Sequence, residues 1–168
     1  MESKAGHEPL VWRVKYRVEK YHGNLPLPED RYGIKPYEVI EEEGNLLLNE
    51  GINELFTILC SATGTKYDNT NARVGVGNSN AAANATQTDL QGGSTAFVGM
   101  DGGYPIFGSS QKAEFRATFD GSTGNFAWEE WTVDNGAAAN KNLNRKVTSL
   151  GTKASGTTWV FTVEIALS

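Results

Sequence analysis

The chain has 168 residues, a formal net charge of −5, and 39% hydrophobic and 21% charged residues. This length predicts one domain, and the acidic balance argues against nucleic-acid binding, which needs a basic surface against the phosphates. The one cysteine, Cys60, excludes an intramolecular disulfide and a cysteine-based metal cluster.

The N-terminal residues 1–10, MESKAGHEPL, contain no apolar stretch of the kind that a secretory signal needs. We expect them to form a loosely held tail. The longest apolar runs, such as LLL at 46–48, are too short to span a membrane. We therefore expect no membrane partner, and a protein that stays in a cytoplasm until it joins something.

Residues 11–19, VWRVKYRVE, alternate between two faces, which predicts a half-buried strand. A stretch rich in proline and glycine follows, and residues 36–43, PYEVIEEE, predict a second strand. Residues 1–44 are therefore interpreted as a tail and an N-terminal β arm. An isolated hairpin is marginally stable in water, so the arm has to lie on the main body or on a partner.

One amphipathic helix is predicted at about residues 48–62. Its apolar stripe consists of Leu48, Ile52, Leu55, Phe56 and Leu59, which is typical of a helix packed on a core. Asn49 is the expected N-cap and Gly64 the expected stop. Cys60 lies beside the stripe and is expected to be a small buried side chain.

Residues 45–168, which include this helix, are interpreted as a β-rich body. Strands are expected at 72–77, 95–100, 112–119, 125–133 and 157–167. In the fourth of these, Trp128 and Trp131 have opposite parity, and a β-bulge near Glu129 and Glu130 is expected to turn both toward the core. The fold prediction is mainly β: an antiparallel β-sandwich or β-barrel-like body with one amphipathic helix and the N-terminal β arm.

The segment RVGVGNSN (73–80) invites a nucleotide-binding interpretation, because Gly75 and Gly77 match the first two glycines of a dinucleotide motif. Asn80 stands in place of the third glycine, and no periodic helix follows. We interpret this segment as a strand whose glycines allow backbone to pack closely on backbone. The sequence predicts no catalytic, cofactor-binding or metal-binding residues and no enzyme.

The polar face of the first strand forms a small basic stripe, Arg13, Lys15 and Arg17, in an acidic chain. One interpretation is an ordinary solvated strand face. The other is a contact surface for an acidic partner or another subunit, with Trp12 and Tyr16 as anchors.

Eight segments occur in an order that resembles a family of small virion structural proteins from tailed bacteriophages. They are NLLLNEGINEL (45–55), NARVGVGNSN (71–80), TQTDLQG (86–92), MDGGYP (100–105), FRATF (115–119), NFAWEEWTVDNG (125–136), LNRKVTSLGTK (143–153) and SGTTWVFTVEIALS (155–168). Members of this family are described as capsid decoration (cement) proteins or as minor structural proteins.

The resemblance implies a decoration protein on the capsid exterior, assembled in the host cytoplasm, that reinforces the head by non-covalent multivalent contacts. Its implied partners are the major capsid protein and other copies of itself, as a homotrimer. The alternative is a tail- or fibre-associated β-sandwich that binds a receptor or carbohydrate through aromatic faces. Strand parity instead assigns Trp128, Trp131 and Trp159 to the core. Small-residue loops such as 78–87 would suit subunit contacts.

Overall fold

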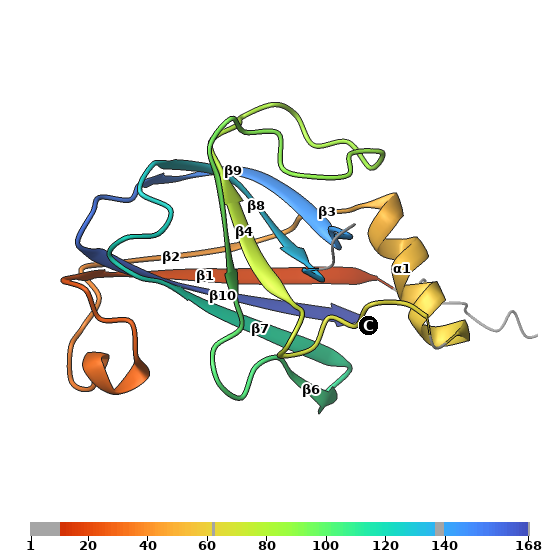
Figure 1. Ribbon diagram of the computed structural model, residues 1–168, viewed down its shortest axis with the longest axis horizontal. Helices are drawn as coiled ribbons and strands as arrows, with labels where there is room; N and C mark the ends of the chain where they lie inside the picture. Colours follow the sequence, from red (N-terminus) through yellow and green to blue (C-terminus); the bar gives the residue numbers. More distant parts are fainter. Residues whose placement is uncertain (1–10, 62, 137–139, 168) are drawn as a thin grey trace, which may run out of the picture.

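The computed structural model describes residues 11–61, 63–136 and 140–167, so the predicted N-terminal tail (1–10) and residue 62 at the predicted end of the helix lie outside the described residues. Within these described ranges, ten strands form two antiparallel sheets, and helix α1 (Asn49–Cys60) lies at one end of them (Figure 1). In the part of the chain that is described, the sheets share no strand. The predicted mainly β body is therefore a sandwich and does not close into a barrel.

The first sheet has the order β2-β1-β10-β7-β6, which is Glu38–Glu43, Trp12–His22, Thr157–Leu167, Lys112–Phe119 and Ile106–Ser109. The second has the order β3-β9-β8-β4-β5, which is Leu46–Leu47, Asn144–Thr152, Ala127–Asp134, Arg73–Gly77 and Thr95–Gly99.

The N-terminal hairpin lies on the main body. Strand β1 pairs with β10 along its whole length, from Trp12 opposite Leu167 to His22 opposite Thr157, and with β2 on its other side. The predicted alternation is confirmed, because Val14, Tyr16 and Val18 are buried. The hairpin is stable because its inner face forms part of the core between the sheets.

The core is dominated by aromatic side chains from β7, β8 and β10. Trp128, Trp131 and Trp159 are almost fully buried, and the ring centroids of Trp128 and Trp159 lie 4.7 Å apart. The predicted bulge is confirmed: the pairing of β8 with β9 shifts between Trp128 and Glu130. Two successive residues, Glu129 and Glu130, therefore separate tryptophans that both face the core.

Helix α1 corrects the prediction that its apolar stripe faces the core. Leu48 is buried, but Phe56 is 60% and Leu59 78% exposed. The helix approaches the body instead through Gly51, where a Cβ would meet the Leu143 Cα at 2.6 Å. This close approach rotates the most apolar side of the helix toward solvent.

Both ends of α1 also differ from the prediction. The N-cap is Leu48, which makes no side-chain cap hydrogen bond. The N–H of Asn49, the first residue of the helix, donates instead to the Ala85 carbonyl of a distant loop at 2.8 Å. The helix ends at Cys60, before Gly64. Cys60 is exposed rather than buried, because it follows the outward-facing Leu59 in the last turn.

Lys153 is a buried cation between two loops. Its Nζ donates to the Asp120 carbonyl at 2.5 Å and to Asn125 Oδ1 at 2.9 Å. Burial lowers the pKa of Lys153 to about 8. Two tyrosines shift the other way: burial raises the pKa of Tyr16 and of Tyr67, assisted by the carboxylates of Glu42 and Glu54 respectively.

We expect the free energy of unfolding to rise between pH 8 and pH 10. In this range the unfolded chain keeps the Lys153 proton, whose ordinary pKa is 10.5, while the folded chain loses it. Above about pH 10 stability falls, because unfolded tyrosines ionise while Tyr16 and Tyr67 in the fold stay neutral. Urea unfolding across this range measures both limbs. Lys153→Met should flatten the rising limb only, and equal slopes in the two proteins would contradict this assignment.

The exposure of Cys60 predicts one thiol that reacts with a water-soluble thiol reagent in the native protein. The reaction should proceed at a rate comparable to that in denaturant, since no unfolding is needed. Absorbance of the released chromophore measures the rate, with Cys60→Ser as the blank. A native reaction slower by about a thousandfold, as required for a thiol exposed only by unfolding, would show that Cys60 is buried.

Candidate interaction surface

The predicted basic stripe is largely neutralised within the sheet. Lys15 Nζ lies 3.3 Å from Glu43 Oε1, and Arg17 pairs with Glu41 of β2 and with Glu19. Arg13 is exposed, and among the described residues no carboxylate lies in ion-pair range of it. Glutamates of β2 thus form ion pairs with Lys15 and Arg17 of β1. This pairing favours the interpretation of the basic stripe as a solvated strand face.

The two predicted anchors lie in different environments. Tyr16 is 2% exposed and its hydroxyl donates to Glu42, so its ring packs inside the sandwich and is not available to a partner. Trp12 is half-buried, and its Nε1 donates to Asn45 Oδ1 at 2.9 Å. Trp12 lies beside an apolar groove at the end of the sandwich and can contribute to a contact there.

The glycines of RVGVGNSN make room for side chains, which corrects the prediction of backbone packed on backbone. Val74 and Val76 face the core, so the glycines of β4 point to the outer face. A Cβ at Gly75 would lie 2.4 Å from the Phe97 ring, and one at Gly77 would lie 2.4 Å from the Glu130 carboxylate. The motif therefore allows a buried carboxylate to lie against the outer face of the sheet.

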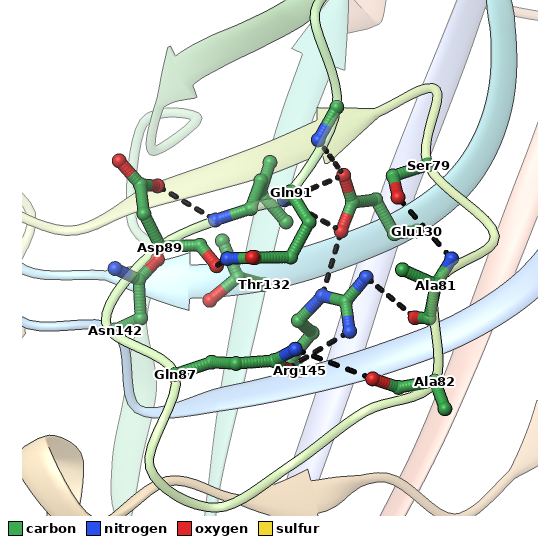
Figure 2. Close-up of polar contacts among 12 residues, drawn as sticks. Ser79, Ala81, Ala82, Gln87, Asp89, Gln91, Glu130, Thr132, Asn142 and Arg145 are labelled. Carbon is green, nitrogen blue, oxygen red and sulfur yellow. Dashed lines mark hydrogen bonds and ion pairs between the residues drawn. The ribbon is translucent and has the colours of Figure 1, made fainter.

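Glu130 and Arg145 form an ion pair in which both side chains are 0% exposed (Figure 2). Arg145 Nε donates to Glu130 Oε2 at 2.6 Å. The carboxylate also accepts the backbone N–H groups of Gln91 and Gly92, and the guanidinium donates to Gln87 Oε1 and to the Ala81 carbonyl. These four hydrogen bonds outside the pair all go to the loop between β4 and β5, residues 78–94.

This loop positions the helix. Its base is closed by Asn78 and Ser94, which exchange two hydrogen bonds, and further along Ala85 accepts the first N–H of α1. Helix α1 makes a further contact with the body through Glu50, whose Oε1 accepts the N–H of Asn142 at 2.8 Å. The buried ion pair, the loop and α1 therefore form one connected unit that extends from the outer face of the second sheet to the end of the sandwich where α1 lies (Figure 1).

One end of the sandwich is apolar and open to solvent. Among the described residues its exposed large hydrophobic side chains are Val11, Leu55, Phe56, Leu59, Ile106, Phe107 and Leu167. We call this the groove end. It has two parts: the outer side of α1, which carries Phe56 and Leu59, and a groove between α1 and the edge strand β6.

The groove has a volume of about 810 Å³. Leu55 and Ile58 of α1 line one wall and Phe107 of β6 the other, with Ile165 and Leu167 of β10 between them. Pockets that hold whole ligands or peptide segments span about 300–1,000 Å³. The space therefore suits several side chains at once.

The sequence alone did not predict the groove end. The only sequence feature that points to the groove end is the apolar stripe on residues 48–59, which equally predicts a helix packed on the core. Hydrophobic periodicity shows that a helix has an apolar face but not whether this face packs on the core or faces solvent. Phe107 was missed because strand β6 (Ile106–Ser109) is only four residues long.

Comparison of the chain with protein-family models, with curated proteins and with solved structures gives no match. Within residues 11–61, 63–136 and 140–167, no group of three or more His, Cys, Asp and Glu side chains is placed to hold a metal ion. No helix over those same ranges is long and apolar enough to cross a membrane.

Glu130→Gln is expected to cost about 3–5 kcal/mol of unfolding free energy, because it leaves the Arg145 guanidinium buried without its counter-ion. The matched control is Glu41→Gln, which removes the exposed partner of Arg17 and should cost less than about 1 kcal/mol. Urea unfolding measures both. Equal losses in the two variants would contradict a structural role for the buried pair.

Proposed function

We propose that this chain is a structural protein of a tailed-bacteriophage virion, and specifically a capsid decoration (cement) protein. In this proposal it stabilises the head by non-covalent multivalent contacts on the capsid exterior and has no catalytic role. Its partners are the major capsid protein and other copies of itself. The ordered series of motifs from residue 45 to residue 168 supports this assignment.

The structural observation that supports the proposal is the exposed apolar surface on the outer side of α1. Phe56 and Leu59 stand next to each other on one helical face and are 60% and 78% exposed. Exposed apolar patches beyond single residues are typical of interaction sites in soluble proteins. The helix beneath them is held by Gly51 against Leu143 and by the loop carbonyl of Ala85. A rigid apolar face of this kind suits docking on a large protein surface.

The carbohydrate-binding alternative rested on the surplus of aromatic residues. Trp128, Trp131 and Trp159 are at most 1% exposed, so these indoles are not available to stack on sugars. A tail or fibre position stays an alternative prediction. Copy number separates the two, since hundreds of copies per virion would indicate the capsid and a handful the tail.

The variant Phe56→Ser/Leu59→Ser is expected to weaken rebinding to stripped, expanded capsids by at least about tenfold, because large apolar side chains at the centre of an interface dominate its affinity. Its folding should be unchanged, as both side chains are exposed. Cosedimentation with capsids measures binding, and Thr95→Ser, exposed on β5, is the matched control. Wild-type protein that does not rebind such capsids would overturn the proposal.

A further inference from the structure

The exposed large apolar side chains of the described residues belong to two groups of segments, and these segments lie at opposite ends of the long axis (Figure 1). One set is the groove end. The other set lies on or beside the loop that connects β1 to β2 and contains the short helix η1 (Pro28–Arg31): Leu27, Tyr32, Ile34, Tyr37 and Val39. We call this the loop end. Every large hydrophobic side chain found exposed in the described residues belongs to one of these two sets.

The two ends differ in shape. The groove end is concave, with its volume of about 810 Å³. The loop end is a projecting tip, on which the Tyr32 side chain is 93% exposed. Tyrosine is enriched among the residues that anchor interfaces, and a tyrosine this exposed, between Arg31 and Gly33 of the loop, has the character of such an anchor.

The loop end is held in shape by its own subunit. Arg31 donates from Nη1 to the Leu25 carbonyl at 2.5 Å, and its guanidinium lies 5.9 Å from the Tyr21 ring centroid. Asp30 accepts the backbone N–H of Leu27, and Ile34 donates to the Arg31 carbonyl. Because these contacts order the loop before any partner arrives, binding loses little conformational entropy.

The charges of the two ends are complementary. Glu29 on η1 and Lys66 at the rim of the groove are both exposed, and among the described residues neither has an ion-pair partner. At the groove Lys112 pairs with Glu164, and Asp68 accepts the N–H groups of Thr70 and Asn71. In the loop Arg31 and Asp30 make hydrogen bonds, while the exposed Lys35 also has no ion-pair partner among the described residues. The complementarity between the two ends therefore concerns Glu29 and Lys66.

We propose that the groove binds the Tyr32 loop of a second copy of this chain. In this head-to-tail contact Tyr32 and Leu27 enter the groove between α1 and β6, and Glu29 faces Lys66. A loop cannot reach the groove of its own subunit, since the two lie at opposite ends of the long axis (Figure 1). The contact is heterologous, so it builds a ring where the rotation closes and an open chain where it does not. The inference rests on the proposed function only in treating the chain as an assembly component.

The test uses two variants of the full chain, without any capsid. Tyr32→Ser removes the tip and Phe107→Asp places a charge on the groove wall; both side chains are exposed, at 93% and 70%, so both variants should fold. Wild-type protein should gain mass with concentration in sedimentation, and each variant alone should stay a monomer. Mixed in equal amounts, they should form a 1:1 dimer and nothing larger, because one supplies only a groove and the other only a loop.

Three outcomes would overturn the proposal. They are wild-type protein that is monomeric at about 1 mM, a mixture of the variants that forms no dimer, and Tyr32→Ser protein that associates like wild type. The last would indicate a groove-to-groove contact. Thr95→Ser, on β5 and outside both sets of exposed apolar residues, is the control and should associate normally.

A charge exchange tests the orientation. Glu29→Lys and Lys66→Glu should each weaken association about two- to fivefold, and the double variant should recover it. Loss in the double variant as well would overturn the assigned pairing. These outcomes are independent of the Phe56 and Leu59 variant, so head-to-tail association can fail while capsid binding holds, and the reverse.

Discussion

The buried ion pair between Glu130 and Arg145 is the interaction on which the rest of the outer structure depends. A charge removed from water costs several kcal/mol unless the fold supplies donors and acceptors for it. Here the loop 78–94 supplies them through its backbone and Gln87 (Figure 2). Gly77 leaves the space that the carboxylate needs. The pair therefore fixes the path of a loop whose own side chains are mostly small and polar.

The fixed loop in turn decides where apolar surface meets solvent. Ala85 accepts the first N–H of α1, and Gly51 brings the helix against Leu143. With the helix held in this orientation, Phe56 and Leu59 point away from the body and a groove stays open beside β6. The contacts that stabilise the loop 78–94 thus also orient the exposed apolar face of α1.

The strands with regular alternation could be predicted from the sequence, and others could not. Along most of β1, β7 and β10 every second residue is apolar and faces inward, so these strands are predictable from alternation alone. The bulge at Glu129 and Glu130 could be predicted because Trp128 and Trp131 have opposite parity. Strand β9 (Asn144–Thr152) begins with two buried polar residues, Asn144 and Arg145, so it carries no alternating signal. The candidate site was predicted less well: of the five expected contact residues, Tyr16 is in the core and two are paired with β2.

The sequence by itself determined the antiparallel β class, the inner faces of four strands and the presence of one helix, because periods of two and 3.6 are local properties of the chain. Only the tertiary structure decided which way the helix faces, what the glycines of β4 accommodate and where a groove opens. Those features depend on contacts between residues far apart in the chain, Gln91 with Glu130 and Ala85 with Asn49. The same apolar stripe would serve a core or an interface, and the long-range contacts of Gly51 with Leu143 and of Asn49 with Ala85 decide between them.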